Sequence, residues 1–425
     1  MTKLEELIKN LCPNEVEYKR FDEACTLNAR IGWQRLTKAE YKTTGDYMLI
    51  TGTDFTISYT INYDSCVYVS EDRYSQDSKI QIKNGDVLIT KDGTLGKVAQ
   101  VNFLPMPATL NGGVFVVRPK DNSLLPRYIM HFLLSDHFQK VVDQQKTGST
   151  ISHLTQALFS RLQIPVPPLP VQEEIVRILD SFTELTAELT AELTARKKQY
   201  EYYRDSLLTF NSQAVQKVKL GDIASIVRGA SPRPIAQYIT SDSNGVNWIK
   251  IGDVKPNSKY ITSTEEKITP EGAKKSRLVK KGDFILSNSM SFGRPYILKI
   301  DGCIHDGWLS ISDFSNTLTA DFLYHVLSSS MMQYEMRKKA SFGGAVQNLN
   351  ADIVRELTIP IPSLETQNKI VQVLDNFDSI CSDLKIGLPA EIEARKKQYA
   401  FYRDKLLSFK ETPTYEQKKE ISKTE

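Results

Sequence analysis

Two short glycine-containing segments carry side chains that suit contact with nucleic acid. One reads TKDGTLGK over residues 90–97, and the other reads SNSMSFGR over residues 287–294. Lysine and arginine can neutralise phosphates or bond guanine edges, asparagine can bond adenine, and serine or threonine can serve either purpose. From these segments and their neighbours we predict the DNA-binding residues Arg30, Gln34, Lys91, Thr94, Lys97, Asn111, Arg228, Ser231, Arg233, Asn288, Ser291, Arg294 and His305. Each could instead be a solvated loop residue, and Asn111 and His305 could be turn residues that satisfy their own backbone.

Motifs for catalysis are missing from the sequence. The five histidines form no H-E-x-x-H pattern, and no G-x-G-x-x-G, G-x-S-x-G or Asn-Pro-Pro-Tyr-like segment occurs. Residues 93–98 differ from a phosphate-binding loop, because Lys91 occupies the place of its first glycine and Val98 that of its hydroxyl residue. We therefore expect no catalytic residue, no cofactor and no metal on this chain.

Composition places further limits on the function. The chain has 425 residues, and its 54 lysines and arginines nearly balance 51 aspartates and glutamates, for a net charge of +3. This excludes a polycation, so any DNA surface must be a local patch. The five cysteines are scattered and indicate unpaired thiols in a reducing compartment. No apolar run is long enough to span a membrane or act as a signal core, so we expect a cytoplasmic protein.

An internal repeat organises the whole chain. Residues 148–182 align with residues 343–377, with 13 of 35 positions identical, where chance would give about two. ARKKQYEYYRDSLLTF at 195–210 recurs as ARKKQYAFYRDKLLSF at 394–409, so the second copy carries four extra residues before this segment. The two glycine-containing segments are also equivalent, 197 residues apart. The chain is two copies of one unit, a variable globule followed by a better matched helical part.

Periodicity predicts the elements of each copy. Ile175, Leu179, Phe182, Leu185, Leu189 and Leu193 form one apolar stripe on a helix of up to about 40 residues. In the second copy, Gly387-Leu388-Pro389 should kink or break the equivalent helix. Strands are predicted over 86–90, 114–117 and 283–286, and single helices over 127–142 and 321–338.

These elements predict an α+β protein with a pseudo-two-fold internal repeat. We expect a first globule at 1–165, a central helical spacer at 166–212, a second globule at 213–362, a C-terminal helical spacer at 363–412 and a charged tail at 413–425. A long amphipathic helix needs a partner, so the two helical regions should pack together as a two-helix coiled coil that separates the mixed α/β domains. The alternative is that each helix packs on its own globule. Two unlike globules on such a spacer would suit two unlike half-sites of DNA.

The whole chain resembles the specificity (S) subunit of type I restriction–modification systems. The TAEL units at 186–193, followed by ARKKQY at 195–200, are similar to the central region of the IC subgroup. The resemblance implies that the globules at 1–165 and 213–362 are target-recognition domains 1 and 2 for a bipartite double-stranded DNA target, and that the two helical regions form an antiparallel coiled coil. It also implies two methyltransferase (M) subunits with S-adenosylmethionine for adenine methylation, and two restriction (R) subunits that use ATP and magnesium. A duplicated scaffold that does not read DNA, and an autonomous DNA-modifying enzyme, are the alternatives that the residues leave open.

Overall fold

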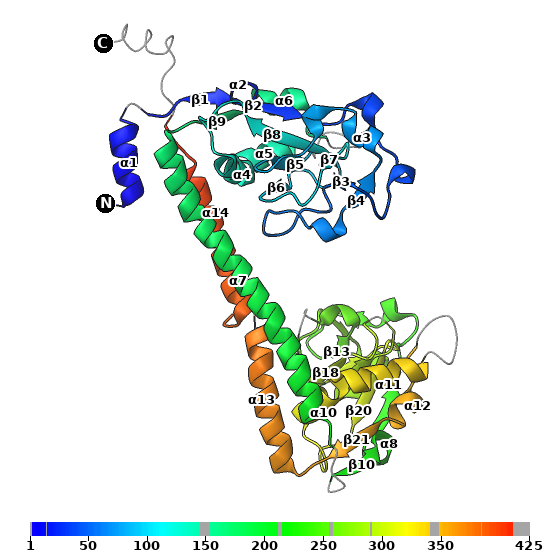
Figure 1. Cartoon of the computed structure of the whole chain (residues 1–425). Helices are drawn as coiled ribbons and strands as arrows, with labels where there is room; N and C mark the ends of the chain where they lie inside the picture. Colours follow the sequence, from blue (N-terminus) through cyan, green and yellow to red (C-terminus); the bar gives the residue numbers. More distant parts are fainter. Residues whose placement is uncertain are drawn as a thin grey trace. The chain divides into compact units, whose positions relative to one another are not determined.

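The computed structural model describes residues 2–13, 15–144, 153–210, 215–254, 258–289, 291–340, 348–383 and 385–410. The chain forms two compact units. Unit 1 comprises Met1–Thr190 and Ile392–Glu425, and unit 2 comprises Ala191–Glu391. Each unit therefore contains a mixed α/β globule and parts of the helical regions (Figure 1).

The globule of unit 1 is built on two small sheets. Its four-stranded antiparallel sheet has the order β2 (Cys25–Asn28), β8 (Val114–Pro119), β5 (Val87–Thr90), β6 (Val98–Gln100). Its three-stranded sheet has the order β4 (Val67–Val69), β3 (Tyr47–Ile50), β7 (Ala108–Leu110), with β3 and β7 parallel. A separate pair joins β1 (Tyr18–Arg20) to β9 (Gln163–Pro165). The helices are α1 (Lys3–Leu11), α2 (Phe21–Ala24), α3 (Glu71–Ser75), α4 (Pro126–Leu134), α5 (Asp136–Gln144) and α6 (Gln156–Arg161).

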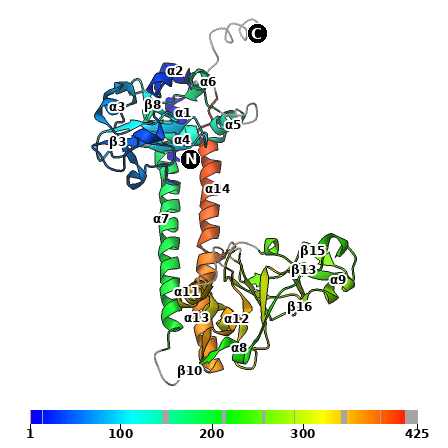
Figure 2. The same ribbon diagram turned by 90° about the vertical axis from the view of Figure 1, so that its right-hand side faces the viewer.

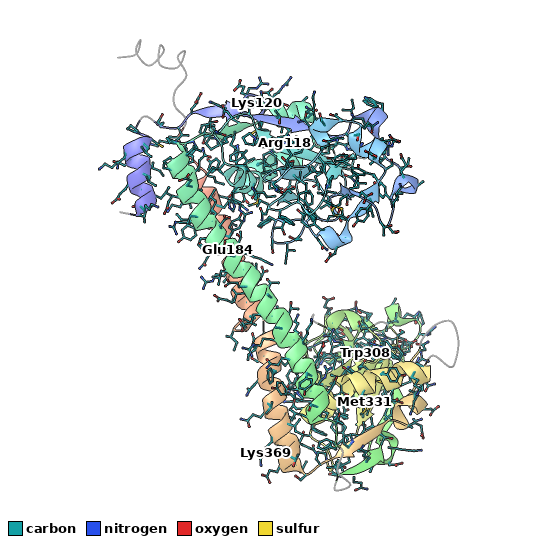
Figure 3. The ribbon with its side chains drawn as sticks, viewed as in Figure 1. Arg118, Lys120, Glu184, Trp308, Met331 and Lys369 are labelled. Atoms are coloured by element: carbon teal, nitrogen blue, oxygen red, sulfur yellow. The ribbon has the colours of Figure 1, made fainter. Side chains whose placement is uncertain are left out.

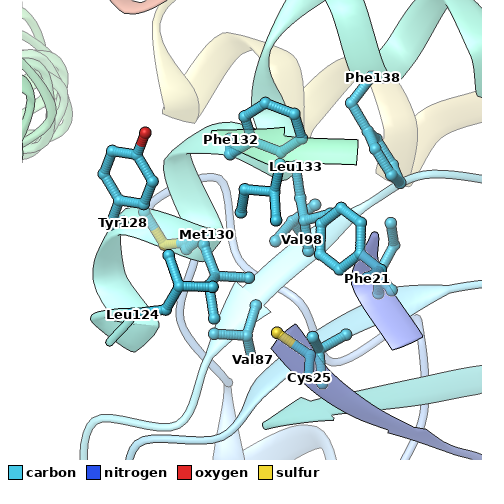
Figure 4. Close-up of a cluster of buried hydrophobic side chains, with 14 of the residues drawn as sticks. Phe21, Cys25, Val87, Val98, Leu124, Tyr128, Met130, Phe132, Leu133 and Phe138 are labelled. Atoms are coloured by element: carbon cyan, nitrogen blue, oxygen red, sulfur yellow. The ribbon is translucent and has the colours of Figure 1, made fainter. Parts of the chain in front are cut away.

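The core of this globule is aromatic. The centroid of the Phe21 ring, at the start of α2, lies 6.0 Å from that of Phe132 and 6.2 Å from that of Phe138 (Figure 4). It lies 4.9 Å from the centroid of the Phe159 ring. Aromatic rings at these separations and tilts add favourable quadrupole contacts to their buried area. The cluster ties α2, α4, α5 and α6 to the four-stranded sheet that carries the loop at residues 90–97.

The globule of unit 2 has two five-stranded sheets. One has the order β11 (Ser225–Arg228), β20 (Trp308–Ser312), β17 (Phe284–Ser287), β18 (Pro295–Leu298), β14 (Tyr260–Ile261). The other has the order β12 (Ile239–Thr240), β15 (Glu266–Ile268), β13 (Val246–Ile249), β19 (Gly302–Ile304), β16 (Arg277–Val279), and β10 (Gln216–Lys219) pairs with β21 (Thr358–Ile361). The helices are α8 (Leu220–Ile223), α9 (Pro270–Lys274), α10 (Ala320–Ser328), α11 (Ser330–Ala340) and α12 (Ala351–Arg355). Trp308, labelled in Figure 3, is completely buried here.

The strands predicted at 86–90, 114–117 and 283–286 are confirmed as β5, β8 and β17. The predicted single helices at 127–142 and 321–338 are wrong, because each is two helices. They divide at Ser135 and at Ser329, whose backbones are extended. Each serine hydroxyl accepts a hydrogen bond at 3.3 Å from the backbone N–H three residues later, as a helix N-cap does.

The long helix is confirmed, and so is its interruption in the second copy. α7 spans Leu169–Leu207 and has 39 residues. The second copy forms α13 (Leu364–Ser382) and α14 (Leu388–Leu406) instead. Gly387 lies between them, where a Cβ would come within 2.7 Å of the carbonyl oxygens of Ser379 and Asp383. Pro389 sits in the first turn of α14, where its missing N–H costs no helix bond.

In each unit, α7 packs antiparallel to a helix of the second copy. In unit 1 its first part lies beside α14 (Figures 1 and 2). There the rings of Phe182 and Tyr402 stack at 5.3 Å. In unit 2 its second part lies beside α13, and the rings of Tyr203 and Phe377 stack at 5.4 Å. The predicted pairing of the helical regions is therefore present within each unit. The helices also pack on the globules, since Ile175 and Leu179 belong to the core of unit 1.

Each globule is held by a helix that comes from the other copy. In unit 1, the Tyr399 hydroxyl of α14 lies 2.9 Å from Nδ1 of the buried His131, whose Nε2 lies 2.9 Å from Asp180. Burial lowers the pKa of His131. In unit 2, Tyr200 of α7 lies 3.3 Å from His325. The contacts of α7 are thus divided between both units, whereas the predicted segments treat it as one spacer, and those segment boundaries stay a prediction.

The same pattern recurs around His325. Its Nε2 lies 2.7 Å from Asp375 of α13, and burial lowers its pKa. Lys259 bonds the same carboxylate at 2.8 Å. The two copies of the repeat therefore build the same buried joint twice, with tyrosine, histidine and aspartate in each.

Candidate nucleic-acid interface

The loop after β5 is fixed by the backbone and by one hydroxyl. The Thr90 hydroxyl donates to the carbonyl of Thr94 and accepts from the N–H of Lys97 at 2.9 Å. Gly96 has a φ of +78°, a left-handed conformation that favours glycine, and its carbonyl accepts from Gln139 of α5 at 2.9 Å. The side chains of Thr94 and Lys97 are left exposed on this fixed loop.

The loop after β17 in unit 2 has the same architecture. Gly293 has a φ of +69°, and its carbonyl accepts from Gln333 of α11 at 2.9 Å. The N–H of Gly293 donates to the carbonyl of Ser287 at 2.8 Å, as that of Gly96 donates to Thr90 at 3.0 Å. Different side chains therefore stand on one shared backbone frame: Thr94 and Lys97 of unit 1 are equivalent in the repeat to Ser291 and Arg294 of unit 2.

In unit 1 the predicted residues gather around two adjoining hollows. One, of about 570 Å³, is lined by Thr94, Lys97 and Asn111 among others. The second, of about 660 Å³, is lined by Lys91 and again by Asn111. The Lys91 ammonium lies 5.2 Å from the centre of the Phe115 ring. Oδ1 of Asn111 accepts from the N–H of Gly113 at 3.0 Å, which is the turn geometry that the sequence allowed.

Arg30 and Gln34 occupy the interior instead of the surface. Arg30 is 3% exposed, and its guanidinium donates to the carbonyls of Leu110, Gln34 and Arg73 and to the side chains of Gln76 and Thr109. Gln34 is 2% exposed and donates to Asp77 at 3.1 Å. Their polar groups already have protein partners, so we leave both out of the DNA contacts proposed below and assign them to the support of their loop.

In unit 2 the predicted residues converge on Asp306, which the sequence prediction missed. The backbone carbonyl of Asp306 accepts from Arg228 at 3.0 Å and from Asn288 at 2.9 Å. Its carboxylate accepts from Ser231 at 2.7 Å and lies 3.7 Å from the Arg233 guanidinium. The hydrogen bond from Ser231 lowers the pKa of Asp306, so the group is a carboxylate at neutral pH.

Three predicted residues of unit 2 differ in their exposure. Ser291 is exposed, with a φ of +56°. Arg294 is half-buried, with its guanidinium 5.5 Å from the centre of the Tyr296 ring. His305 accepts from the N–H of Gly307 at 2.8 Å, and burial lowers its pKa, so it is a neutral turn residue.

The sequence could have indicated Asp306, since it lies in the segment 305–307 that aligns with 111–113. Trp33, Arg35 and Lys38, which follow Arg30, are exposed and were also missed. Their signal was the cluster of one aromatic and two cations close to the predicted residues. Among the described residues, no group of three or more histidine, cysteine, aspartate or glutamate side chains could hold a metal ion.

None of the helices within the described ranges is both long and apolar enough to cross a membrane.

Comparison with known proteins gives this arrangement a family. Residues 13–196 and 213–394 each match the type I restriction modification DNA specificity domain. A putative type I restriction enzyme specificity subunit of Haemophilus influenzae is 33% identical over 337 residues, which cover 76% of this chain and 82% of that protein. The EcoR124I/EcoR124II specificity subunit of Escherichia coli is 31% identical over 310 residues, which cover 69% of this chain and 73% of that protein.

Solved structures show the same fold. The S subunit of a type I restriction–modification system from M. genitalium has a TM-score of 0.52 at 14% identity, covering 92% of this chain and 96% of that one. A chain from a structure concerned with complex assembly and conformational transition of the type I system has a TM-score of 0.59 at 17% identity, covering 93% and 98%. With two matched DNA specificity domains and a relative that is 33% identical over most of both chains, this protein belongs to the specificity subunits of type I restriction enzymes.

Proposed function

We propose that each unit reads one half of a bipartite, asymmetric DNA target. One observation carries this proposal. The loops after β5 and β17 share their backbone bonds and a left-handed glycine, yet they present different polar side chains. A conserved frame with changed side chains is what two readers of different sequences require, because base edges are distinguished by the pattern of hydrogen-bonding groups that meets them.

The proposed contacts are the surface members of the predicted set. In unit 1 these are Lys91, Thr94, Lys97 and Asn111. In unit 2 they are Arg228, Ser231, Arg233, Ser291 and Arg294. Asn288 is buried at 4% exposure and donates to the carbonyl of Asp306, so we assign it to the support of these residues. We assign His305 to the turn that holds them.

The chemistry is assigned to partner subunits. Two M subunits would supply S-adenosylmethionine and methylate adenine, and two R subunits would supply ATP- and magnesium-dependent restriction, with this chain acting in the cytoplasm as their non-catalytic guide. The near-neutral net charge of +3 supports this division of labour, because each phosphate contact adds affinity and the chain alone offers few spare cations. The helical regions α7, α13 and α14 are the docking places that we assign to the M subunits.

We further propose that the chain belongs to the IC subgroup and that the TAEL segment of α7 sets the spacing between half-sites. The support is that residues 183–193 lie inside one continuous helix. Adding or removing a four-residue TAEL unit would therefore lengthen or shorten this helix by about 6 Å. The length of this segment would then determine how many base pairs separate the two half-sites.

Sequencing of modified adenines in a host with and without this chain tests the proposal. We expect one interrupted, asymmetric motif to be methylated only when the chain is present together with M. Purified chain and M should then bind a duplex with that motif and should lose binding when either half is scrambled. A chain that assembles with M but leaves every sequence equally methylated would be a scaffold, and methylation without M would make it an enzyme.

A further inference from the structure

Trp33 is displayed on the surface of unit 1. It lies in the single turn of 3₁₀ helix at Gly32–Gln34, five residues beyond the end of β2, and is 68% exposed. Ile31 beside it is 55% exposed. The other two tryptophans of the chain, Trp248 and Trp308, are 3% and 0% exposed. A tryptophan in this position presents a large flat apolar face to whatever approaches unit 1.

The turn that carries Trp33 is held firmly from inside. Arg30 and Gln34, which flank it, are buried and bonded as described above. The side chain of Gln34 also accepts from the N–H of Ile31 at 3.1 Å, and the backbone N–H of Gln34 donates to the carbonyl of Ile31 at 2.8 Å. Because these bonds fix the backbone before any partner arrives, little loop order has to be gained on binding.

The surroundings of this turn are rich in cations. The hollow of about 660 Å³ is lined by Ile31 from the turn and by Arg35 and Lys91. Asp92 also lines it, and its carboxylate is bonded to His153. Lys38, exposed nearby in the chain, lines the adjoining hollow together with Lys97. Trp33 itself lines neither hollow, but its chain neighbours Ile31 and Arg35 line the one that also contains Lys91. An exposed apolar face that adjoins lysine and arginine is complementary to stacked bases between phosphates and much less so to an apolar protein surface.

We propose that Trp33 stacks against the bases of the half-site read by unit 1, entering a base step as an apolar wedge while Arg35 and Lys91 hold the flanking phosphates. Apolar side chains that enter a base step unstack it and bend the duplex. Unit 2 has a different group at the matching place, since Arg233 lies five residues beyond the end of β11 with its side chain 82% exposed. The two units would then deform their half-sites differently. This inference rests on the proposed function.

Three variants of the full chain, each assembled with M, test the wedge. Trp33→Phe retains an aromatic face, and Trp33→Ala removes it. Phe103→Ala is the matched control, because Phe103 is another aromatic of unit 1, 66% exposed, on the connection between β6 and β7. The duplex is the one identified by modified-adenine sequencing. Stacking of one base on an aromatic side chain predicts about a 5- to 150-fold loss of affinity for W33A, near-normal affinity for W33F and no loss for F103A.

Tryptophan emission provides a second measurement that is independent of affinity. The difference between the wild type and W33F isolates Trp33, whatever tryptophans M contributes. Addition of the duplex should quench this difference emission, and a duplex with the first half-site scrambled should not. This comparison holds even when W33A fails to fold.

Two results would overturn the inference while leaving DNA reading intact. In the first, the wild type binds and methylates its target, the difference emission does not change, and W33A binds with equal affinity. This result would show that no base contacts Trp33. Loss of assembly between W33A and M in the absence of DNA would identify Trp33 as an anchor for the partner protein. If wild type itself selected no duplex, the proposed function would fail first, and separately.

Discussion

Removal of one TAEL unit, residues 190–193, tests whether α7 sets the gap between half-sites. Four residues shorten an α-helix by about 6 Å and turn its end by about 400°, a net rotation of about 40°. One base pair of B-DNA accounts for about 36° of rotation. Two base pairs account for about 7 Å of length. Where α7 runs along the duplex, the deletion should therefore shorten the preferred spacer by one or two base pairs.

The interruption of the second copy should let the molecule tolerate this deletion. α13 ends at Ser382 and α14 begins at Leu388, so a short non-helical connection joins them. Because the N–H of Gly387 donates to the carbonyl of Asp383 at 3.1 Å, the two ends of this connection already lie close together, and the roughly 6 Å has to be absorbed by unwinding of the adjoining helix ends. The stacked pairs Phe182–Tyr402 and Tyr203–Phe377 lie outside the deleted segment and can both be kept.

The assay is methylation of a duplex library in which the spacer length varies and both half-sites are randomised. The deletion should move the preferred spacer and leave both half-site sequences unchanged, and insertion of a second copy of 190–193 should move the spacer in the opposite direction. Replacement of Thr190 and Thr194 by alanine keeps the helix length and is the matched control, for which no shift is expected. An unchanged spacer together with altered half-sites would refute this model.

Three further predictions concern single side chains. Lys97→Ala should weaken binding to one half-site and Arg294→Ala binding to the other, by about 1–3 kcal/mol each if the two side chains contact bases. A binding titration measures both effects. Equal losses of affinity on all DNA sequences would show that the two cations contact phosphates only. Asp306→Ala removes the acceptor of the Ser231 hydroxyl and should reduce discrimination at the second half-site by about 0.5–1.5 kcal/mol in competition binding; tighter binding to every duplex would mean that the carboxylate merely repels phosphate. Burial lowers the pKa values of His131 and His325. As the pH drops below about 6.5, these histidines therefore bind protons in the unfolded chain before they do so in the folded chain. The free energy of unfolding should consequently fall over this range. Urea titrations at pH 7.5 and 5.5 measure this fall, and the same fall in a variant with both histidines replaced by glutamine would assign it to other groups.

Much of the fold could be predicted because the repeat doubles every signal. A strand such as β5 is indicated by a short apolar run between glycines, and the equivalent strand of the second copy, β17, shows the same pattern. The break before α14 could be predicted from Gly387 and Pro389, which have local steric reasons. The division of α4 from α5 was missed because apolar periodicity continues through Ser135, although this serine is a local N-cap signal whose hydroxyl accepts from the N–H of Phe138 three residues later.

The candidate site was predicted by residue type, and residue type does not report burial. Arg30 looks like a phosphate ligand in the sequence, yet the carbonyl groups of Leu110 and Arg73, from two distant segments, converge on its guanidinium. Asp306 looks unsuited to DNA, yet it positions the cations and hydroxyls around it. Both outcomes depend on contacts between residues far apart in the sequence, and such contacts leave no pattern in a single chain.

The joint between His131 and Tyr399 connects residues that are 268 positions apart in the sequence. A ribosome that adds about 5–20 residues per second needs roughly 15–50 s to travel that distance. Throughout this interval the N-terminal globule has already been synthesised, but α14 has not. The surface that α14 will cover, including the imidazole of His131, therefore remains open to water. Nascent chains halted before residue 399 should therefore be more susceptible to proteases and chaperones than released protein, and completion of translation itself becomes the step that closes the first globule.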